Sequence, residues 1–302
     1  MTLSMIEFQI QLLILMSVGY LIRKIGLVSN ETRSGMSSVL LYVILPANIV
    51  NAFMQDISFS SELLTNSLYA MAVSAFVQFG TYFLGMFLYR NAEPNKNPVL
   101  RYGILSTNAA FIGIPTLENL YGPMGTLYGA IFMIPYRLTI WTIGIGLFRK
   151  SEKKDVLKQL LHPCMIAVLI GFIIMGFGLT LPDVIAKPVQ MMSRCTTPLS
   201  MLVIGGILAG VDLRTVFSKE TLTFSFIRLL ALPGILVLLL HFIPADPMIK
   251  GIAIVMTGMP AASMSAILAE QYGGDYEFGA KIVMASTVLS MITVPLLGFF
   301  IK

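Results

Sequence analysis

The sequence predicts an all-α polytopic membrane protein of ten transmembrane helices, arranged as two inverted five-helix repeats whose fourth and ninth helices are broken. Three observations lead to this fold class. Apolar runs of roughly 20 residues, the length that crosses a bilayer as a helix, recur along the whole chain of 302 residues. Only 12% of the residues are charged, about half the share found in soluble domains, which argues against a soluble enzyme. Glycine, proline and small polar residues interrupt two of the runs at corresponding positions.

Turn and charge signals such as "RNAEPNKNP", "RKSEKKD" and "IPADP" separate the apolar runs. The N-terminal stretch "MTLSMIEFQIQLLILMSVGYLIRK" lacks the basic start and the small-residue cleavage site of a signal peptide, so we expect it to be retained as the first span. The expected spans cover residues 5–25, 34–56, 63–89, 99–120, 124–148, 162–181, 189–211, 219–243, 246–270 and 277–301.

Lysine and arginine fall mainly in alternate loops, and this asymmetry predicts the orientation. The richer set is Arg23, Lys24, Arg33, Arg90, Lys96, Arg101, Arg149, Lys150, Lys153, Lys154, Lys158, Arg214, Lys219 and Lys281. The opposite loops hold Lys187, Arg194, Lys250 and Lys302. Because basic loops stay in the cytoplasm, the richer set is expected there. We then expect a multi-pass protein of the plasma membrane with both termini extracytoplasmic.

The basic segment 149–161 divides the chain into two halves of five spans, residues 1–148 and 162–302. An odd number of spans in each half gives the halves opposite orientations, which is the plan of many secondary transporters. "LYGPMGTLYGAIFM" in the first half resembles "QYGGDYEFGAKIVM" in the second, and Pro46 has a counterpart in Pro198. Chance similarity between apolar segments is the alternative explanation.

The fourth and ninth spans are interrupted near the middle of the membrane. A proline frees a backbone carbonyl one turn back, and in hydrocarbon such a group is costly unless protein or water satisfies it. A matched pair of broken helices therefore indicates a substrate site, and half-helix N-termini at the gap favour anions. A simple proline kink is the alternative for either span alone. The polar, glycine and proline residues at the interruptions are Ser106, Thr107, Asn108, Gly113 and Pro115, and Thr257, Gly258, Pro260, Ser263 and Ser265.

Three motifs, "LPANIV", "STNAAFIGIP" and "GMPAASMSAILAEQYGGD", resemble the bacterial branch of the auxin efflux carrier family. The resemblance extends over the whole chain. It implies a scaffold of helices 1, 2, 6 and 7 and a transport domain of helices 3–5 and 8–10, with broken helices 4 and 9 crossing at the centre, as in bile-acid sodium symporters. It also implies an organic anion transporter with an elevator mechanism that forms a homodimer through the scaffold. Indole-3-acetate is the plant substrate, and malate or malonate are substrates among bacterial relatives.

By position, Asn108 and Pro115 match the crossover motif of the fourth helix in that family, and Pro260 matches that of the ninth. The chain departs from the plant carriers in its short linker. It also has "TNAAFIGIP" in place of the asparagine–proline–asparagine arrangement. Both departures put auxin in doubt as the substrate.

Two arginines fall inside expected spans. Arg137, about halfway along the fifth span, could bind a substrate carboxylate in bidentate fashion or pair with a structural partner. Arg228 lies about a third of the way along the eighth span, where we expect it to extend to the cytoplasmic surface.

Four further polar residues are candidates for the site. Glu118 and Glu270 end the fourth and ninth spans, either as proton or cation coupling sites or as solvated helix-end charges. Asn48 and Asn51 follow Pro46, where they could line the substrate face or satisfy carbonyls that the proline frees.

A secondary transporter of small organic anions is the function that these features favour. An anion channel and an intramembrane enzyme are the alternatives. The chain has no H-E-x-x-H, G-x-S-x-G or P-loop pattern, so we expect no catalysis and no cofactor. The isolated Cys164 and Cys195 predict neither a disulfide nor a metal site. We expect no nucleic-acid partner. H⁺ and Na⁺ both remain open as coupling ions.

Overall fold

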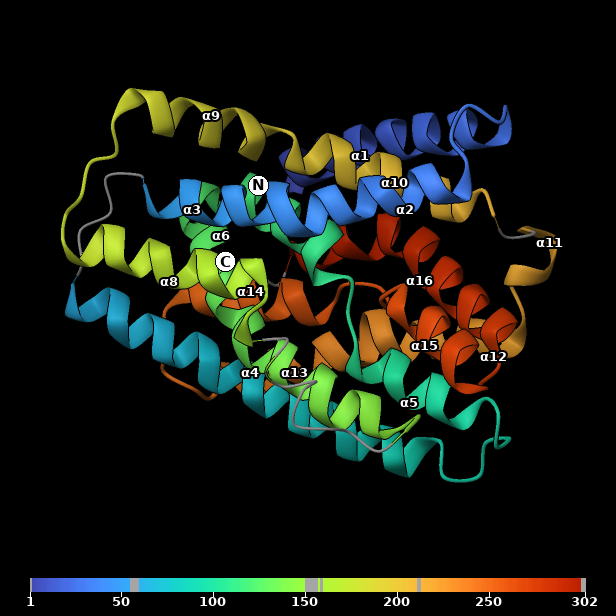
Figure 1. Ribbon diagram of the computed structural model, residues 1–302. Coiled ribbons are helices and arrows are strands. Elements are labelled where there is room, and N and C mark those ends of the chain that lie inside the picture. Colours follow the sequence, from blue (N-terminus) through green and yellow to red (C-terminus); the bar gives the residue numbers. More distant parts are fainter. Residues whose placement is uncertain (1, 55–59, 150–156, 158–159, 211–212, 300–302) are drawn as a thin grey trace. The chain divides into compact units, whose positions relative to one another are not determined.

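The computed structural model describes residues 2–54, 60–149, 157, 160–210 and 213–299, and all regular elements within these ranges are helices (Figure 1). The helical segments follow the expected spans to within a few residues at most ends. They are α1 (Thr2–Lys24), α2 (Asn30–Val39), η1 (Leu40–Ile44), α3 (Leu45–Phe53), α4 (Ser61–Leu88), α5 (Asn97–Leu105), η2 (Ala109–Gly113), α6 (Ile114–Thr139), η3 (Ile140–Gly144), α8 (Pro163–Gly176), α9 (Asp183–Arg194), α10 (Thr196–Leu208), α11 (Leu213–Val216), α12 (Lys219–Phe226), η4 (Ile227–Ala231), α13 (Leu232–His241), α14 (Pro247–Thr257), α15 (Met264–Tyr272) and α16 (Tyr276–Leu297).

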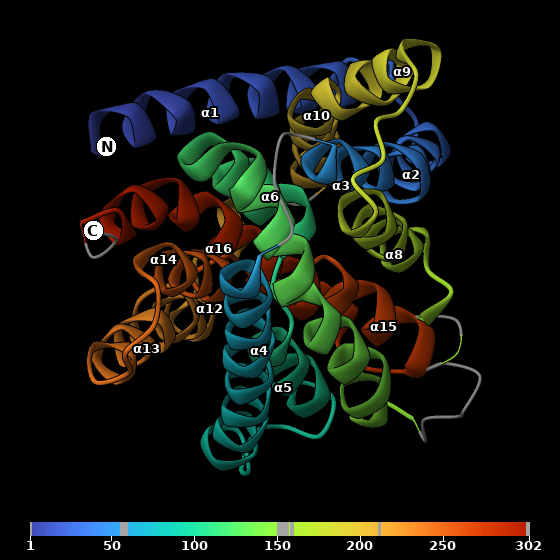
Figure 2. The same ribbon diagram turned by 90° about the vertical axis from the view of Figure 1, so that its left-hand side faces the viewer.

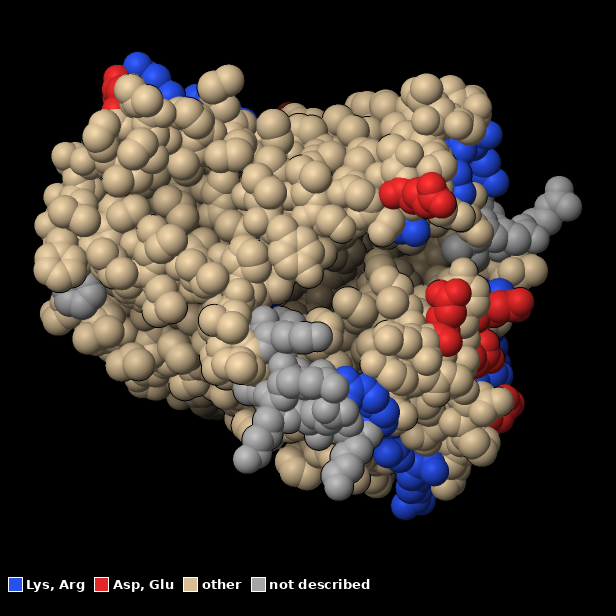
Figure 3. Space-filling model, in the orientation of Figure 1, with Lys and Arg blue, Asp and Glu red and all other residues tan. Residues whose placement is uncertain are grey.

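Five helical stretches in the described part of the chain are long and apolar enough to cross a bilayer. Large apolar side chains on them remain exposed, among them Phe76, Phe79, Phe83 and Phe87 on α4. On the face drawn in Figure 3 most of the surface carries no charge. Such surface fits a lipid environment better than water. The five stretches are 30–53, 61–88, 183–208, 219–241 and 276–297.

Prolines set three of the four π-helical turns that the structure describes. The turns η1, η2 and η4 each end two residues before a proline, namely Pro46, Pro115 and Pro233. A proline cannot donate the hydrogen bond that would continue the α-helical ladder, so the preceding turn widens. These local expansions change which side chains face the interior on either side of each turn.

The helix α6 contains the boundary between the fourth and fifth expected spans. Gly122 has φ 61° and ψ −147° inside it. Only glycine adopts this conformation readily, so the chain bends there and two helices join at a kink. The expected linker 149–161 lies largely outside the described residues.

The chain forms two compact units. Unit 1 comprises Met1–Tyr69, Ala110–Ile131 and Leu160–Gly210. Within it α1 packs along α10, and α3 packs on α8 and α9 (Figures 1 and 2). The backbones of α1 and α10 lie so close together that a Cβ at Gly205 would overlap the carbonyl oxygen of Met16. Small residues at such contacts let helix backbones approach.

Unit 2 comprises Ala70–Ala109, Phe132–Gln159 and Val211–Lys302. Within it α16 packs on α5, α12 and α15 (Figure 1). The buried residues Val99, Ile104, Phe224 and Ile282 belong to the core that joins these helices. This core holds α5 beside α15, and so positions the ends of the broken helices.

Candidate functional site at the meeting of two helix breaks

The helix α5 ends in the middle of an apolar run. The N–H of Ser106 still donates to the carbonyl of Tyr102 at 2.7 Å, but Ser106 itself is extended, with φ −95° and ψ 137°. Helical structure resumes at Ala109. The predicted interruption of the fourth span is therefore present at Ser106–Asn108.

The helix α14 ends at Thr257 in the same way. Gly258 follows with φ −80° and ψ 2°, and α15 begins only at Met264. Pro260 within the gap has no N–H to continue a helix. A Cβ at Gly258 would overlap the end of the Leu297 side chain, so glycine also serves close packing there. The predicted interruption of the ninth span is present as well.

The two breaks meet in unit 2. Thr107 and Ala261 form an isolated antiparallel β-bridge, and the N–H of Asn108 donates to the carbonyl of Pro260 at 2.7 Å. Backbone groups freed by the two breaks are thus paired with each other. This pairing removes part of the cost of breaking a helix in hydrocarbon.

Side chains complete the support of the bridge. The hydroxyl of Tyr136 donates to the carbonyl of Thr107 at 2.8 Å and accepts from the N–H of Thr107 at 3.0 Å. The hydroxyl of Thr107 donates to the carbonyl of Met256 at 3.1 Å, and the N–H of Ala261 donates to Ser286 Oγ at 3.2 Å. Each contact satisfies a buried backbone group that the breaks leave open.

The predicted serines beside the breaks pair with each other. Ser106 Oγ and Ser265 Oγ lie 3.3 Å apart, and both side chains are fully buried. Ser106, Thr107 and Ser265 therefore hold the two breaks together. Ser263, by contrast, is only half-buried just before α15.

The carboxamide of Asn108 is different from these side chains. Asn108 is 8% exposed, and its side chain makes no hydrogen bond to any residue that the structure describes. Its backbone, in contrast, is fixed by Pro260. A positioned carboxamide with unused donors and acceptor is suited to bind a ligand.

Other predicted site residues lie in unit 1. Asn48 Nδ2 donates to Glu118 Oε2 at 3.1 Å and to Ser193 Oγ at 3.0 Å, and Asn51 Nδ2 lies 3.3 Å from the same Ser193 Oγ. These four residues form a polar cluster on α3, α6 and α9. Gly113, the last residue of η2, and Pro115, at the start of α6, are also buried in this unit. The predicted residues therefore fall into two groups, one in each unit.

Three charged residues discussed from the sequence lie in unit 2 and differ in burial. Glu270 is exposed near the end of α15, whereas Arg137 is half-buried in α6 and engaged in an interaction within the protein. The expectation for Arg228 was wrong. Its side chain is only 2% exposed and donates from Nη1 to the carbonyl of Thr257 at 2.9 Å, because the helix turns it toward the interior.

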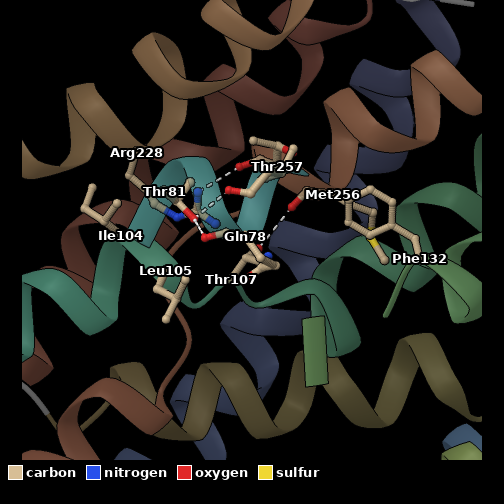
Figure 4. Close-up of a pocket in the computed structure, with 10 residues that line it drawn as sticks. Gln78, Thr81, Ile104, Leu105, Thr107, Phe132, Arg228, Met256 and Thr257 are labelled. Carbon is tan, nitrogen blue, oxygen red and sulfur yellow. Dashed lines mark hydrogen bonds between the residues drawn. The ribbon is translucent and has the colours of Figure 1, made fainter. Parts of the chain in front are cut away.

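A small cavity lies beside Arg228. Its volume of ≈ 10 Å³, measured for the centre of a water-sized sphere, is close to the minimum for one water molecule. Figure 4 shows Arg228 reaching the end of α14 beside Gln78 and Thr257. The lining residues are Val77, Gln78, Thr81, Ile104, Leu105, Thr107, Phe132, Arg228, Met256 and Thr257.

Comparison with known proteins identifies the family. A family model described as membrane transport protein matches residues 4–156 and 147–298. The chain belongs to the membrane transport protein family. The resemblance of the motifs to auxin efflux carriers is thereby confirmed, and the apolar helices of this family member are those of a multi-pass membrane protein.

Two relatives of this membrane transport protein are similar over nearly their full length. An uncharacterized transporter of Methanocaldococcus jannaschii is 26% identical over 300 residues, covering 96% of each chain. An uncharacterized transporter of Methanothermobacter thermautotrophicus is 24% identical over 295 residues, again covering 96% of each chain. The family and both relatives are named for transport, which favours a transporter over an enzyme.

Sequence reasoning missed several residues of this membrane transport protein. Tyr136 stands directly before the charged Arg137, and Gln78 is an isolated carboxamide in an apolar run. A polar residue inside an expected span was the available signal in both cases. Ser193 and Ser286 gave no signal, because their roles depend on contacts with distant segments.

Proposed function

We propose that the protein is a secondary carrier of small organic anions, and that the meeting of the two helix breaks is its substrate site. The observation that carries the proposal is the carboxamide of Asn108, which is held at the bridge but not used by it. The positive end of the α15 dipole begins beside the same gap, which favours a carboxylate there.

Substrate contacts would come from both sides of the gap. Ser263 would offer its hydroxyl from the α15 side of the gap. Gly258 and Pro260 would shape the gap without donating to the anion, because the N–H of Gly258 already donates to the carbonyl of Ile254 and Pro260 has no N–H. Arg137 would supply a positive charge from α6, one residue from Tyr136. Ser106, Thr107 and Ser265 would keep these groups in position, since their own hydrogen bonds are already made.

We propose ten membrane-spanning segments in two inverted repeats, with both termini outside the cytoplasm of the plasma membrane. Unit 1 would act as the scaffold, including the dimer contact, and unit 2 as the moving transport domain of an elevator. The support is that helices from both halves of the chain gather in each compact unit. That division agrees with the one implied for helices 1, 2, 6 and 7, but unit 1 also holds residues 110–131 of expected helices 4 and 5 and the start of expected helix 3.

A coupling proton would be carried by Glu118 in preference to Glu270. Glu118 is part-buried and accepts a hydrogen bond from Asn48, which gives its carboxylate a defined partner. Glu270 is exposed at a helix end, where a carboxylate is simply solvated. Asn48 and Asn51 would then hold the Glu118 carboxylate in position within unit 1.

Counterflow in proteoliposomes tests the carrier function. Vesicles preloaded with unlabelled acetate, malonate, malate or indole-3-acetate would be diluted into buffer with the same compound labelled. We expect saturable labelled uptake that depends on the preload for at least one of the four compounds. Conductance that does not saturate would indicate an anion channel, and chemical conversion of the compound would indicate an intramembrane enzyme; either result would reject a carrier.

A further inference from the structure

Arg228 carries a buried charge that no carboxylate pairs with among the described residues of unit 2. Its side chain is 2% exposed and makes no ion pair with any described residue. Burying an unpaired cation is costly unless nearby groups stabilise it. The groups that surround the guanidinium therefore indicate its role.

Two half-helix C-termini point at the Arg228 cavity. The cavity is lined by Ile104 and Leu105 at the end of α5, and by Met256 and Thr257 at the end of α14. The last carbonyls of a helix have no partner inside the helix, and this end carries about half a negative charge. Arg228 Nη1 satisfies the carbonyl of Thr257 at 2.9 Å. The guanidinium is thus stabilised by backbone and helix dipoles.

Further oxygen atoms face the same space. Gln78 Oε1 and Thr257 Oγ1 are buried and accept no hydrogen bond from any described residue, although both residues line the cavity with Arg228. Gln78 is 2% exposed and Thr257 is 4% exposed, so bulk water does not satisfy these atoms. Helix C-termini and unwound carbonyls with such side-chain oxygens are the groups that coordinate Na⁺ in carriers with broken helices.

We infer that the guanidinium of Arg228 is a built-in cation, which occupies the place that a mobile monovalent metal ion would take between these oxygens. Only the part of this inference that concerns transport rests on the proposed carrier function. Because the charge is covalently attached, folding and transport need no Na⁺. Truncating the side chain leaves an oxygen-lined space that a free cation can fill.

The experiment measures the Tm of the purified protein without substrate, in choline chloride, NaCl and low guanidinium chloride at equal ionic strength. The wild type should melt at the same temperature in choline and sodium. Arg228→Ala should have a lower Tm in choline, and Na⁺ or guanidinium should raise it by a few degrees. Arg194→Ala, which removes an exposed arginine with no hydrogen bond to a described residue, is the matched control and should not respond.

Two results would overturn the inference. One is an Arg228→Ala protein whose Tm does not change with any of the cations. The other is a wild-type protein that Na⁺ stabilises over choline. If Arg228→Ala does not fold, Arg228→Lys must fold and remain insensitive to sodium, because its ammonium is still a tethered cation. None of these measurements uses a carboxylate, so they can succeed even where the proposed transport is disproved.

Discussion

Tyr136 is the single side chain on which the bridge between the helix breaks most depends. Its hydroxyl both donates to and accepts from the backbone of Thr107, and the residue is 8% exposed. Tyr136→Phe leaves a buried N–H and a buried carbonyl without partners, so we expect a loss of about 1–3 kcal/mol in stability. A lower Tm and weaker counterflow should follow. Tyr276→Phe, which removes an exposed hydroxyl, serves as the control, and an equal Tm loss in both variants would contradict this role.

Glu118 provides a second residue-scale prediction, which concerns coupling. Glu118→Gln keeps a hydrogen-bonding side chain beside Asn48 but cannot release a proton at neutral pH. If Glu118 carries the coupling proton, uptake driven by a pH gradient should fall at least about tenfold, while counterflow persists. A tenfold loss corresponds to about 1.4 kcal/mol of free energy. Glu270→Gln, on an exposed helix end, should leave both assays unchanged. Unchanged gradient-driven uptake by Glu118→Gln would contradict the coupling role and indicate that Glu118 is structural.

At the scale of helices, the contact between α1 and α10 depends on Gly205. A methyl group there would collide with the backbone of Met16, which cannot move as a side-chain end can. We expect Gly205→Ala to cost about 1–3 kcal/mol in stability, the range typical of overpacking. A chemical or thermal unfolding curve in detergent measures this. Gly80→Ala on α4, where nothing lies within 4 Å of the added Cβ, should cost nothing; an undisturbed Gly205→Ala would contradict the close packing.

The helix breaks themselves were predictable because their causes are local. Pro115 and Pro260 restrict the backbone wherever they stand, Gly258 lowers the cost of leaving the helical conformation, and both interruptions occur where these residues indicated. The pairing of Thr107 with Ala261 could not be predicted from the neighbouring residues, since it joins segments far apart in the chain. Ser106 and Ser265 were correctly expected beside the breaks, but only the structure shows that they bond to each other.

Arg228 shows the limit of reasoning from position along a span. A position a third of the way along a span suggests that a long side chain can reach water, but the direction of the side chain depends on helix rotation. Here Arg228 lies in the π-helical turn η4, before Pro233, and is directed into unit 2. The sequence contains the proline that widens the turn, yet the neighbour that receives the arginine, Thr257, comes from another helix.

At the scale of the whole molecule, the distribution of lysine and arginine predicts the orientation in the membrane. In a background with Cys164 and Cys195 replaced by serine, Thr2→Cys should react with an impermeant maleimide on intact cells. Asn91→Cys, in the loop after α4, should react only after permeabilisation. The reverse pattern would contradict the proposed orientation, and labelling of both on intact cells would contradict the proposed number of spans between them.

The central claim is that the meeting of the two breaks binds a carboxylate through Asn108. The most direct test is equilibrium binding of the labelled compound that gives counterflow, measured on purified wild-type protein, Asn108→Ala and the exposed-loop control Asn91→Ala. We expect Asn108→Ala to weaken binding about tenfold or more, because one or two hydrogen bonds to a charged group are lost, and Asn91→Ala to bind like the wild type. Wild-type affinity in a folded Asn108→Ala protein would contradict the claim.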